Sequence, residues 1–158
     1  MKEKVYVNIK GLHLQSEGQD NNADTEEAIE VIHVGRYKVV NGKEYIKYDE
    51  VYEGESDKCS CMIKINGDQV EITKKGAITA HLSFIEGEKT MTFYDTPYGN
   101  LYLGVFARSI KLERSEDRIY ILIDYALELN YEQVSDCKVE IEISSNGSFS
   151  LENTGENK

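Results

Sequence analysis

The sequence predicts an all-β protein, a single antiparallel, up-and-down β-barrel of about eight to ten strands. Short segments in which apolar and polar residues alternate recur along the chain, which is typical of half-buried strands. Short turns separate these segments, and no stretch predicts a convincing helix. Gly11 and Gly35 coincide with changes of phase in the alternation, which predicts β-bulges that bend strands around a barrel.

The longest alternation lies between Met91 and Asn130. It predicts strands over Met91–Asp95, Leu101–Ala107 and Ile119–Leu129. The last strand has one wholly apolar face, made by Ile119, Ile121, Ile123, Tyr125, Leu127 and Leu129. Between the first two strands, Thr96-Pro-Tyr-Gly99 predicts a tight corner, because Pro97 presets φ and Gly99 supplies a positive φ.

Asn41-Gly42 and Asn66-Gly67 are hairpin signals, because both central residues of a type I′ turn require φ > 0. The remaining strands are predicted over Lys4–Gln15, Ile29–Val40, Lys43–Tyr52, Cys59–Ile65, Val70–Thr73, Ile78–Phe84 and Cys137–Ile143. The barrel domain is therefore expected over residues 1–145, with a mobile acidic loop at 15–27 and a polar C-terminal tail at 146–158.

The chain carries a net charge of −11, which argues against nucleic acid and anionic membrane surfaces as partners. No apolar run approaches the roughly 20 residues that span a bilayer, and the N-terminus lacks the apolar region of a signal peptide. The three cysteines, an odd number, fit a reducing compartment. A cytoplasmic location is therefore expected, while the oligomeric state stays open.

Few residue patterns in this sequence indicate chemistry. Cys59 and Cys61 share one face of a strand, but no second Cys/His pair lies at metal-site spacing. His13, His33 and His81 fall on three different predicted strands, which favours unrelated roles over a shared site. We therefore expect no metal, cofactor or disulfide. Because no nucleophile motif occurs, no catalytic residue is assigned, and enzymatic activity stays undecided.

Tyrosine is the most informative residue type, since eleven occur in 158 residues. In a barrel lumen a tyrosine offers a ring to pack on a ligand and a hydroxyl to orient it, although its strand propensity alone explains its presence. Arg108 lies near a phase change and could hold an anion if it pointed inward; pointing outward, it would be solvated. The candidate ligand-binding residues are Tyr48, Glu50, Tyr98, Arg108 and Tyr125.

Several strings together carry a family resemblance. They are Gly35-Arg-Tyr-Lys with Asn41-Gly42, Tyr45-Ile-Lys-Tyr48-Asp-Glu50, Tyr94-Asp-Thr-Pro-Tyr-Gly99 followed by Leu101 and Val105, and Tyr125-Ala-Leu127. The chain resembles, over about Lys4 to Ser144, the YwiB-type family of small uncharacterised bacterial proteins with calycin-like, or lipocalin-like, β-barrels. The resemblance implies that fold and a bacterial cytosolic setting, but no binding or catalytic residues.

The function that these observations favour is binding of a small, partly apolar ligand in the barrel lumen. The alternative is a structural or protein-interaction barrel whose lumen is filled by side chains; an enzyme ranks third. A barrel of about eight strands is just wide enough for either arrangement. A lumen cavity of roughly 300 Å³ or more with converging polar groups would favour binding, whereas a lumen packed by Ile119, Ile121, Ile123 and the tyrosines would count against it and leave the interaction alternative.

Overall fold

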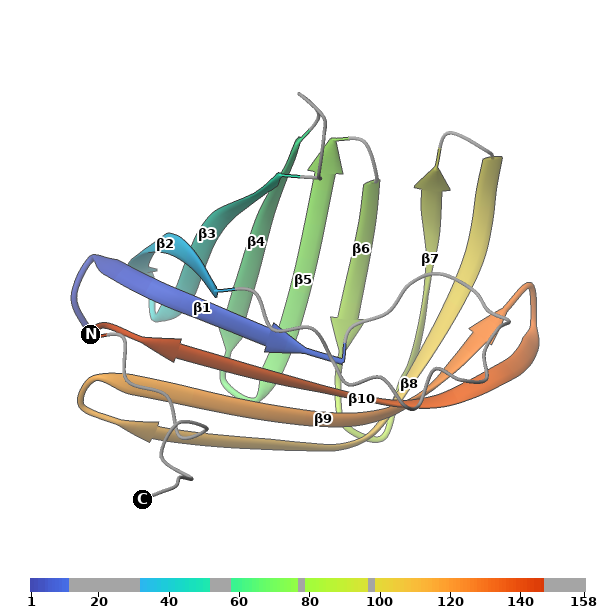
Figure 1. Ribbon diagram of the computed structural model, residues 1–158. Coiled ribbons are helices and arrows are strands. Elements are labelled where there is room, and N and C mark those ends of the chain that lie inside the picture. Colours follow the sequence, from blue (N-terminus) through green and yellow to red (C-terminus); the bar gives the residue numbers. More distant parts are fainter. Residues whose placement is uncertain (12–31, 52–57, 77–78, 97–98, 147–158) are drawn as a thin grey trace, which may run out of the picture.

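The computed structural model describes residues 1–11, 32–51, 58–76, 79–96 and 99–146. Ten antiparallel strands form a nearly closed barrel (Figure 1), which confirms the predicted fold class. Their bounds are β1 Lys4–Lys10, β2 Ile32–Val40, β3 Lys43–Val51, β4 Lys58–Asn66, β5 Gln69–Gly76, β6 Thr79–Phe84, β7 Lys89–Thr96, β8 Gly99–Ser115, β9 Arg118–Leu129 and β10 Glu132–Ser144. The acidic loop 15–27, Pro97, Tyr98 and nearly all of the tail 146–158 lie outside the described residues.

From β2 to β9, each strand pairs with the next one along the chain, and β1 closes the barrel between β2 and β10. The pairing is shortest between β6 and β7, where the ladder holds two residue pairs, Thr79 with Asp95 and Ala80 with Tyr94. Further along this seam, the Thr90 hydroxyl donates to the Ser83 carbonyl at 2.7 Å. A side chain therefore continues the contact where the backbone ladder ends.

Strand β8 changes direction along its length. In Figure 1 it starts beside β7 and then turns to run under the other strands next to β9. The turn coincides with a β-bulge at Arg108, where the register with β9 shifts between Ala107 and Ser109. The alternation changes phase at this bulge, so the strand continues to Ser115 rather than ending at Ala107 as predicted.

The prediction of a β-bulge at Gly35 is wrong. Gly35 pairs in unbroken register with Val5 on one side and Tyr48 on the other. A Cβ at this position would lie 2.7 Å from the Lys47 carbonyl oxygen and 3.3 Å from the Tyr48 Cβ. The glycine permits close approach of β2 and β3 rather than a bulge. Gly11 has a φ of 89° directly after β1, and the bulge expected there involves residues outside the described part.

The turn predicted at Asn41-Gly42 is confirmed, since these residues have φ of 53° and 77°. The β9–β10 turn also has two consecutive residues with positive φ, although neither is a glycine. These are Asn130 and Tyr131, with φ of 52° and 75°. The backbone N–H of Asn130 donates to the Tyr102 carbonyl at 2.8 Å, and the ring centroids of Tyr102 and Tyr131 lie 5.3 Å apart. Contacts with β8 thus hold this turn in a conformation that its residues rarely adopt.

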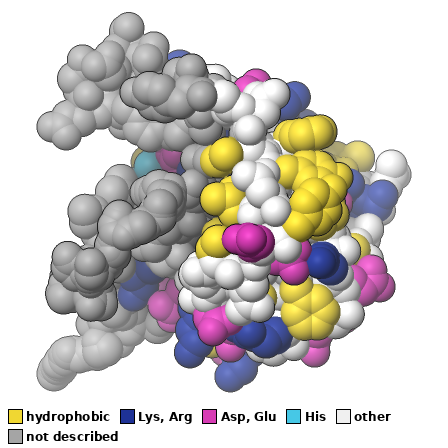
Figure 2. Space-filling model, turned by 90° about the vertical axis from the view of Figure 1, so that its right-hand side faces the viewer, with side chains coloured by type: hydrophobic (Ala, Val, Ile, Leu, Met, Phe, Trp, Pro, Cys, Tyr) yellow, Lys and Arg dark blue, Asp and Glu magenta, His cyan; other side chains and the backbone are white. Residues whose placement is uncertain are grey.

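Apolar side chains from all ten strands except β2 and β7 fill the middle of the barrel. The largest that are fully buried are Tyr125, Phe84, Ile46, Ile63, Ile65, Ile72, Leu82, Ile119, Ile121, Ile123, Ile141 and Ile143. Hydrophobic side chains also gather outside, on the face that β7, β8 and the β9–β10 turn form (Figure 2), where Phe93 is 63% and Tyr131 71% exposed. Interior packing therefore stabilises the barrel, and one outer face stays apolar.

We expect Gly99→Ala to lower the free energy of unfolding by about 1 kcal/mol. Gly99 has a φ of 135°, as the sequence predicted, and an added Cβ would meet no atom within 4 Å, so the cost is backbone strain alone. Urea unfolding measures the effect. Asn100→Ala, at the next exposed position, is the control and should change stability by less than about 0.5 kcal/mol. Equal effects of both substitutions would contradict a conformational role for Gly99.

Candidate functional site

Polar side chains meet inside the barrel at the end where β3 finishes and β4 begins. The lumen-end cluster consists of His33 on β2, Tyr48 and Glu50 on β3, Cys61 on β4 and Lys74 on β5. Strand alternation explains its position. Tyr48 and Glu50 continue the inward row that starts at Ile46, and Lys74 continues the inward row of Ile72. The inward rows thus change from apolar to polar at this end of the lumen.

An ion pair forms the centre of the lumen-end cluster. The Lys74 Nζ lies 3.0 Å from one Glu50 carboxylate oxygen and 3.4 Å from the other. The two side chains are only 13% and 18% exposed. Removing two charges from water costs several kcal/mol, which their attraction only partly returns. A barrel that needed only packing here would be at least as stable with apolar residues, so the pair suggests a role beyond folding.

His33 and Tyr48 lie beside the ion pair, with their ring centroids 5.0 Å apart. Burial lowers the pKa of His33 below its usual value of 6.5, and the charge of Lys74 lowers it further, while Glu50 opposes this change. The imidazole is therefore mostly neutral at pH 7 and offers one donor and one acceptor nitrogen. Together with the Tyr48 hydroxyl, it gives the cluster uncharged groups that can both donate and accept hydrogen bonds.

Cys61 contributes an unreactive thiol. Burial raises its pKa to about 12, and the Glu50 carboxylate adds to this effect. The thiol therefore stays protonated at neutral pH, and a protonated thiol is neither a nucleophile nor a metal ligand. Cys59 points into the lumen on the same strand face, as predicted, and both are buried. All three cysteines of the chain are free.

The metal-ligating residue types do not converge in the described part of the chain, where no three His, Cys, Asp or Glu side chains could hold an ion together. His33 points into the lumen, whereas His81 lies on the outer surface, where its Nδ1 is 3.1 Å from the Thr73 hydroxyl oxygen. His13 lies outside the described residues. The two described histidines are therefore unrelated.

A second polar group closes the opposite end of the lumen. Arg114 of β8 donates to the Glu44 carboxylate of β3 at 2.7 Å, and the Tyr37 hydroxyl donates to the same carboxylate at 2.6 Å. Burial would raise the pKa of Glu44, but the hydrogen bonds from Arg114 and Tyr37 lower it below its usual value. These bonds join β8 to β2 and β3 across the barrel, so we interpret this group as structural.

The structure brings together two of the predicted site residues, Tyr48 and Glu50. Tyr125 instead lies in the core, fully buried against Phe84. Arg108 lies on the outer surface, where it forms ion pairs of 3.1 Å with Asp124 and 3.0 Å with Asp136. Arg108 therefore points outward, so of the two arrangements considered from the sequence it has the one with a solvated side chain rather than the one that holds an anion in the lumen. Tyr98 lies outside the described residues, so its role stays a prediction.

The sequence analysis missed His33 and Lys74 as members of the cluster. The predicted strand ends at Thr73, whereas β5 continues to Gly76. Extending the alternation of Val70 and Ile72 by one step would have placed Lys74 inward, opposite the inward row of β4. Strand alternation is also the signal for His33. Residues two apart on a strand face the same side, so His33 faces the same side of β2 as Gly35 and Tyr37. Neither residue stood out by type.

Two hollows of the described surface lie outside the barrel rather than in the lumen. The larger, about 990 Å³, and the smaller, about 470 Å³, lie over the outer face of β2 to β5 and share Glu3, Arg36, Lys47 and Met62. The part of the lumen that the structure describes is filled by side chains along its middle. Neither hollow is therefore the lumen cavity that would favour binding, and a ligand in the lumen would have to occupy the polar end rather than the packed centre.

The described residues include no helix that is long and apolar enough to cross a membrane. This finding agrees with the absence of a long apolar run in the sequence.

Comparisons with known proteins identify the family of the chain. Residues 12–141 match the model of the family described as Domain of unknown function (DUF1934). The chain is 29% identical over 122 residues to the uncharacterized beta-barrel protein YwiB of Bacillus subtilis (strain 168), covering 77% of this chain and 83% of that protein. The crystal structure of that bacterium's ywiB protein has the same fold, with a TM-score of 0.70 at 21% identity over 90% of this chain and 92% of the other. The chain therefore belongs to the DUF1934 family, with YwiB as a bacterial relative of the same β-barrel fold.

Proposed function

We propose that this protein binds a small, partly apolar molecule at the lumen-end cluster, in the bacterial cytoplasm. The observation that carries the proposal is the Lys74–Glu50 pair, which sits inside the barrel beside His33 and Tyr48. The cluster combines charged and neutral hydrogen-bonding groups, and apolar side chains lie next to it along the same strands. A few polar groups at the edge of an apolar surface are typical of small-molecule sites.

The charge of the cluster suggests what kind of ligand it takes. Lys74 and Glu50 neutralise each other, and the lowered pKa keeps His33 mostly uncharged at neutral pH. A ligand carboxylate would face the Glu50 charge, and a ligand amine would face the Lys74 charge. An uncharged polar end, such as a hydroxyl or an amide, would instead donate to Glu50 and accept from Lys74. The ligand class is therefore a small amphiphile with a neutral polar end.

Saturation-transfer NMR with octanamide, 1-octanol and octanoate tests this function. We expect the amide and the alcohol to bind and the carboxylate to bind more weakly. The test variant is Glu50→Gln/Lys74→Met, which removes both charges together and should still fold. The matched control is Asp49→Asn/Lys75→Met, because these neighbours undergo the same changes but point outward.

The proposal requires that the inward variant loses binding and the outward variant keeps it. If neither octanamide nor 1-octanol binds the unmodified protein, the lumen-end cluster is not a ligand site. The same conclusion holds if the inward and outward variants bind these probes equally well. The alternative would then stand, a barrel with a filled lumen that acts through its outer surface.

A further inference from the structure

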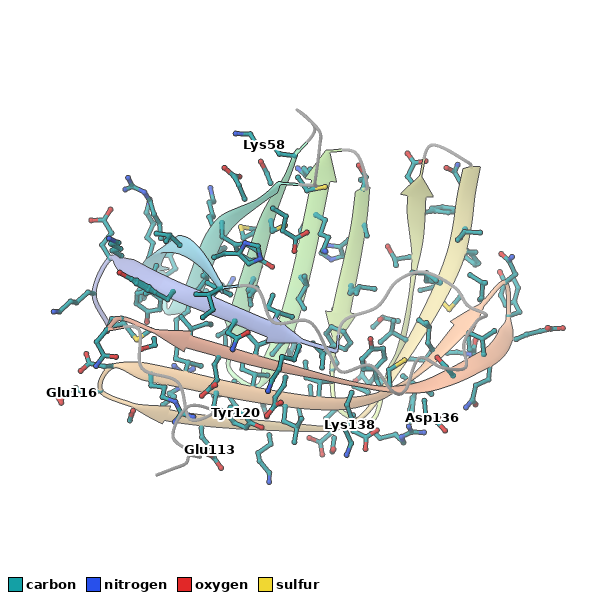
Figure 3. All side chains as sticks on the ribbon, in the orientation of Figure 1. Lys58, Glu113, Glu116, Tyr120, Asp136 and Lys138 are labelled. Atoms are coloured by element: carbon teal, nitrogen blue, oxygen red, sulfur yellow. The ribbon has the colours of Figure 1, made fainter. Side chains whose placement is uncertain are left out.

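The outer face of β2 to β5 concentrates positive charge in an acidic protein. Basic residues at its outward positions include Arg36, Lys38, Lys47, Lys58, Lys64 and Lys75. The acidic residues at outward positions of these strands are Asp49 and Glu71, although the whole chain carries a net charge of −11. In Figure 3, the labelled Lys58 lies at the start of β4, whereas the labelled Glu113, Glu116 and Asp136 lie on the side of β8 to β10, as does the labelled Lys138. The outward positions of β2 to β5 thus carry more basic than acidic side chains.

This basic face is also hollow. The grooves of about 990 Å³ and 470 Å³ described above adjoin each other across it, since both are lined by Arg36, Lys47 and Met62. Val34, which is 61% exposed, and Met62 give the larger groove an apolar floor between the basic side chains. Concave shape, apolar floor and charged borders occur together here, as they do in many binding grooves.

Among the described residues, some cations that border the basic groove have an ion-pair partner and others do not. Arg36 forms an ion pair with Glu3 at 3.0 Å, and Lys58 lies 3.7 Å from Asp49. By contrast, Lys38, Lys47 and Lys75 are exposed and have no ion-pair partner among the residues that the structure describes. An anionic ligand would therefore gain favourable electrostatic energy beside these three lysines.

We propose that the basic groove binds an extended acidic segment of a partner protein. Alternate side chains of an extended segment point to the same side about 7 Å apart, so a row of carboxylates can meet Lys47, Lys75 and Lys38. The methylene groups of these acidic side chains would lie on Val34 and Met62. The groove lies mainly over the outer face of β2 to β5. Tyr48 and Cys61 of the lumen-end cluster also line its larger part, whereas Glu50 and Lys74 are not among its lining residues.

Two features favour a polypeptide over a nucleic acid in this groove. The whole-chain charge of −11 repels a polyphosphate at long range more strongly than a short peptide of lower charge. A single strand of nucleic acid also needs exposed aromatic rings on which its bases stack. Tyr45, which borders the smaller groove, already has the Lys64 ammonium over its ring at 5.9 Å from the centroid.

Fluorescence anisotropy with a labelled peptide of about 12 residues, built from Glu-Val-Glu-Ser repeats, tests the proposal. We expect the peptide to bind the full chain, and raising the salt from about 0.05 M to about 0.5 M to weaken binding at least about tenfold. A peptide of the same length built from Lys-Val-Lys-Ser repeats should not bind. The variant Lys47→Glu/Lys75→Glu should lose at least about tenfold in affinity, and the milder Lys47→Gln/Lys75→Gln should lose part of it.

The matched control is Lys111→Glu/Lys138→Glu, which makes the same charge change at exposed positions of β8 and β10. Equal losses in both charge-reversed variants would show an effect of net charge alone and would overturn the proposal. Tighter binding of a labelled single-stranded oligouridylate than of the acidic peptide would overturn it in favour of nucleic acid. Glu50→Gln/Lys74→Met should leave peptide binding unchanged, which separates this groove from the lumen-end cluster.

Discussion

Replacing Lys74 by methionine is expected to lower the free energy of unfolding by about 3 kcal/mol. The Lys74 ammonium lies 3.0 Å from the Glu50 carboxylate, and both side chains are more than four-fifths buried. Without the ammonium, Glu50 would keep a buried negative charge beside Tyr48 and Cys61. Methionine fills nearly the same volume, so little packing is lost. Urea unfolding of the purified variant at pH 7 measures the change.

The double variant Glu50→Gln/Lys74→Met separates charge from packing. It removes both charges, so its stability should return to within about 1 kcal/mol of the unmodified protein. Lys75→Met provides the neighbouring control, and because that side chain points outward its effect should be less than about 0.5 kcal/mol. If Lys74→Met costs no more than Lys75→Met, water already screens the pair, and the argument for a functional site in the lumen weakens.

The fold was predictable because strand alternation is a local property of the sequence. Every predicted strand occurs, and the turn at Asn41-Gly42 has the predicted positive φ at both residues. Local patterns do not report which strands approach closely, which explains the error at Gly35. There, the glycine accommodates the backbone of β3 rather than an extra residue in β2. Of the phase changes that the structure describes on both sides, the one near Arg108 marks a real bulge and the one at Gly35 does not.

The candidate site was only partly predictable, because it depends on where strands end. Tyr48 and Glu50 lie within a clear alternation, and the structure places both in the lumen-end cluster. Lys74 lies in Lys74-Lys75-Gly76, a string that reads as a turn, although the ladder with β4 extends through Gly76. Strand ends are set by pairing with a neighbour rather than by the sequence of one strand. Residue type does not decide the role of Tyr125, since tyrosine suits both a core and a ligand site.

Replacing Tyr125 by alanine is expected to lower the free energy of unfolding by about 4 kcal/mol. The side chain is fully buried, and its ring lies 5.1 Å from that of Phe84 at an interplanar angle of 63°, an edge-to-face contact. Strands on both sides of the barrel meet at this contact, so the cavity left by alanine cannot collapse without moving a strand. Urea unfolding or calorimetry would measure the loss.

The variant Tyr125→Phe decides whether this tyrosine is only part of the core. The described residues near its hydroxyl offer no partner stronger than the thiol of Cys137, a weak hydrogen-bonding group. Removing the hydroxyl should therefore change stability by less than about 1 kcal/mol. It should also leave octanamide binding unchanged, because the polar end of the ligand is held at Lys74 and Glu50. A stable Tyr125→Phe variant that loses octanamide binding would move the ligand site from the lumen end into the barrel centre.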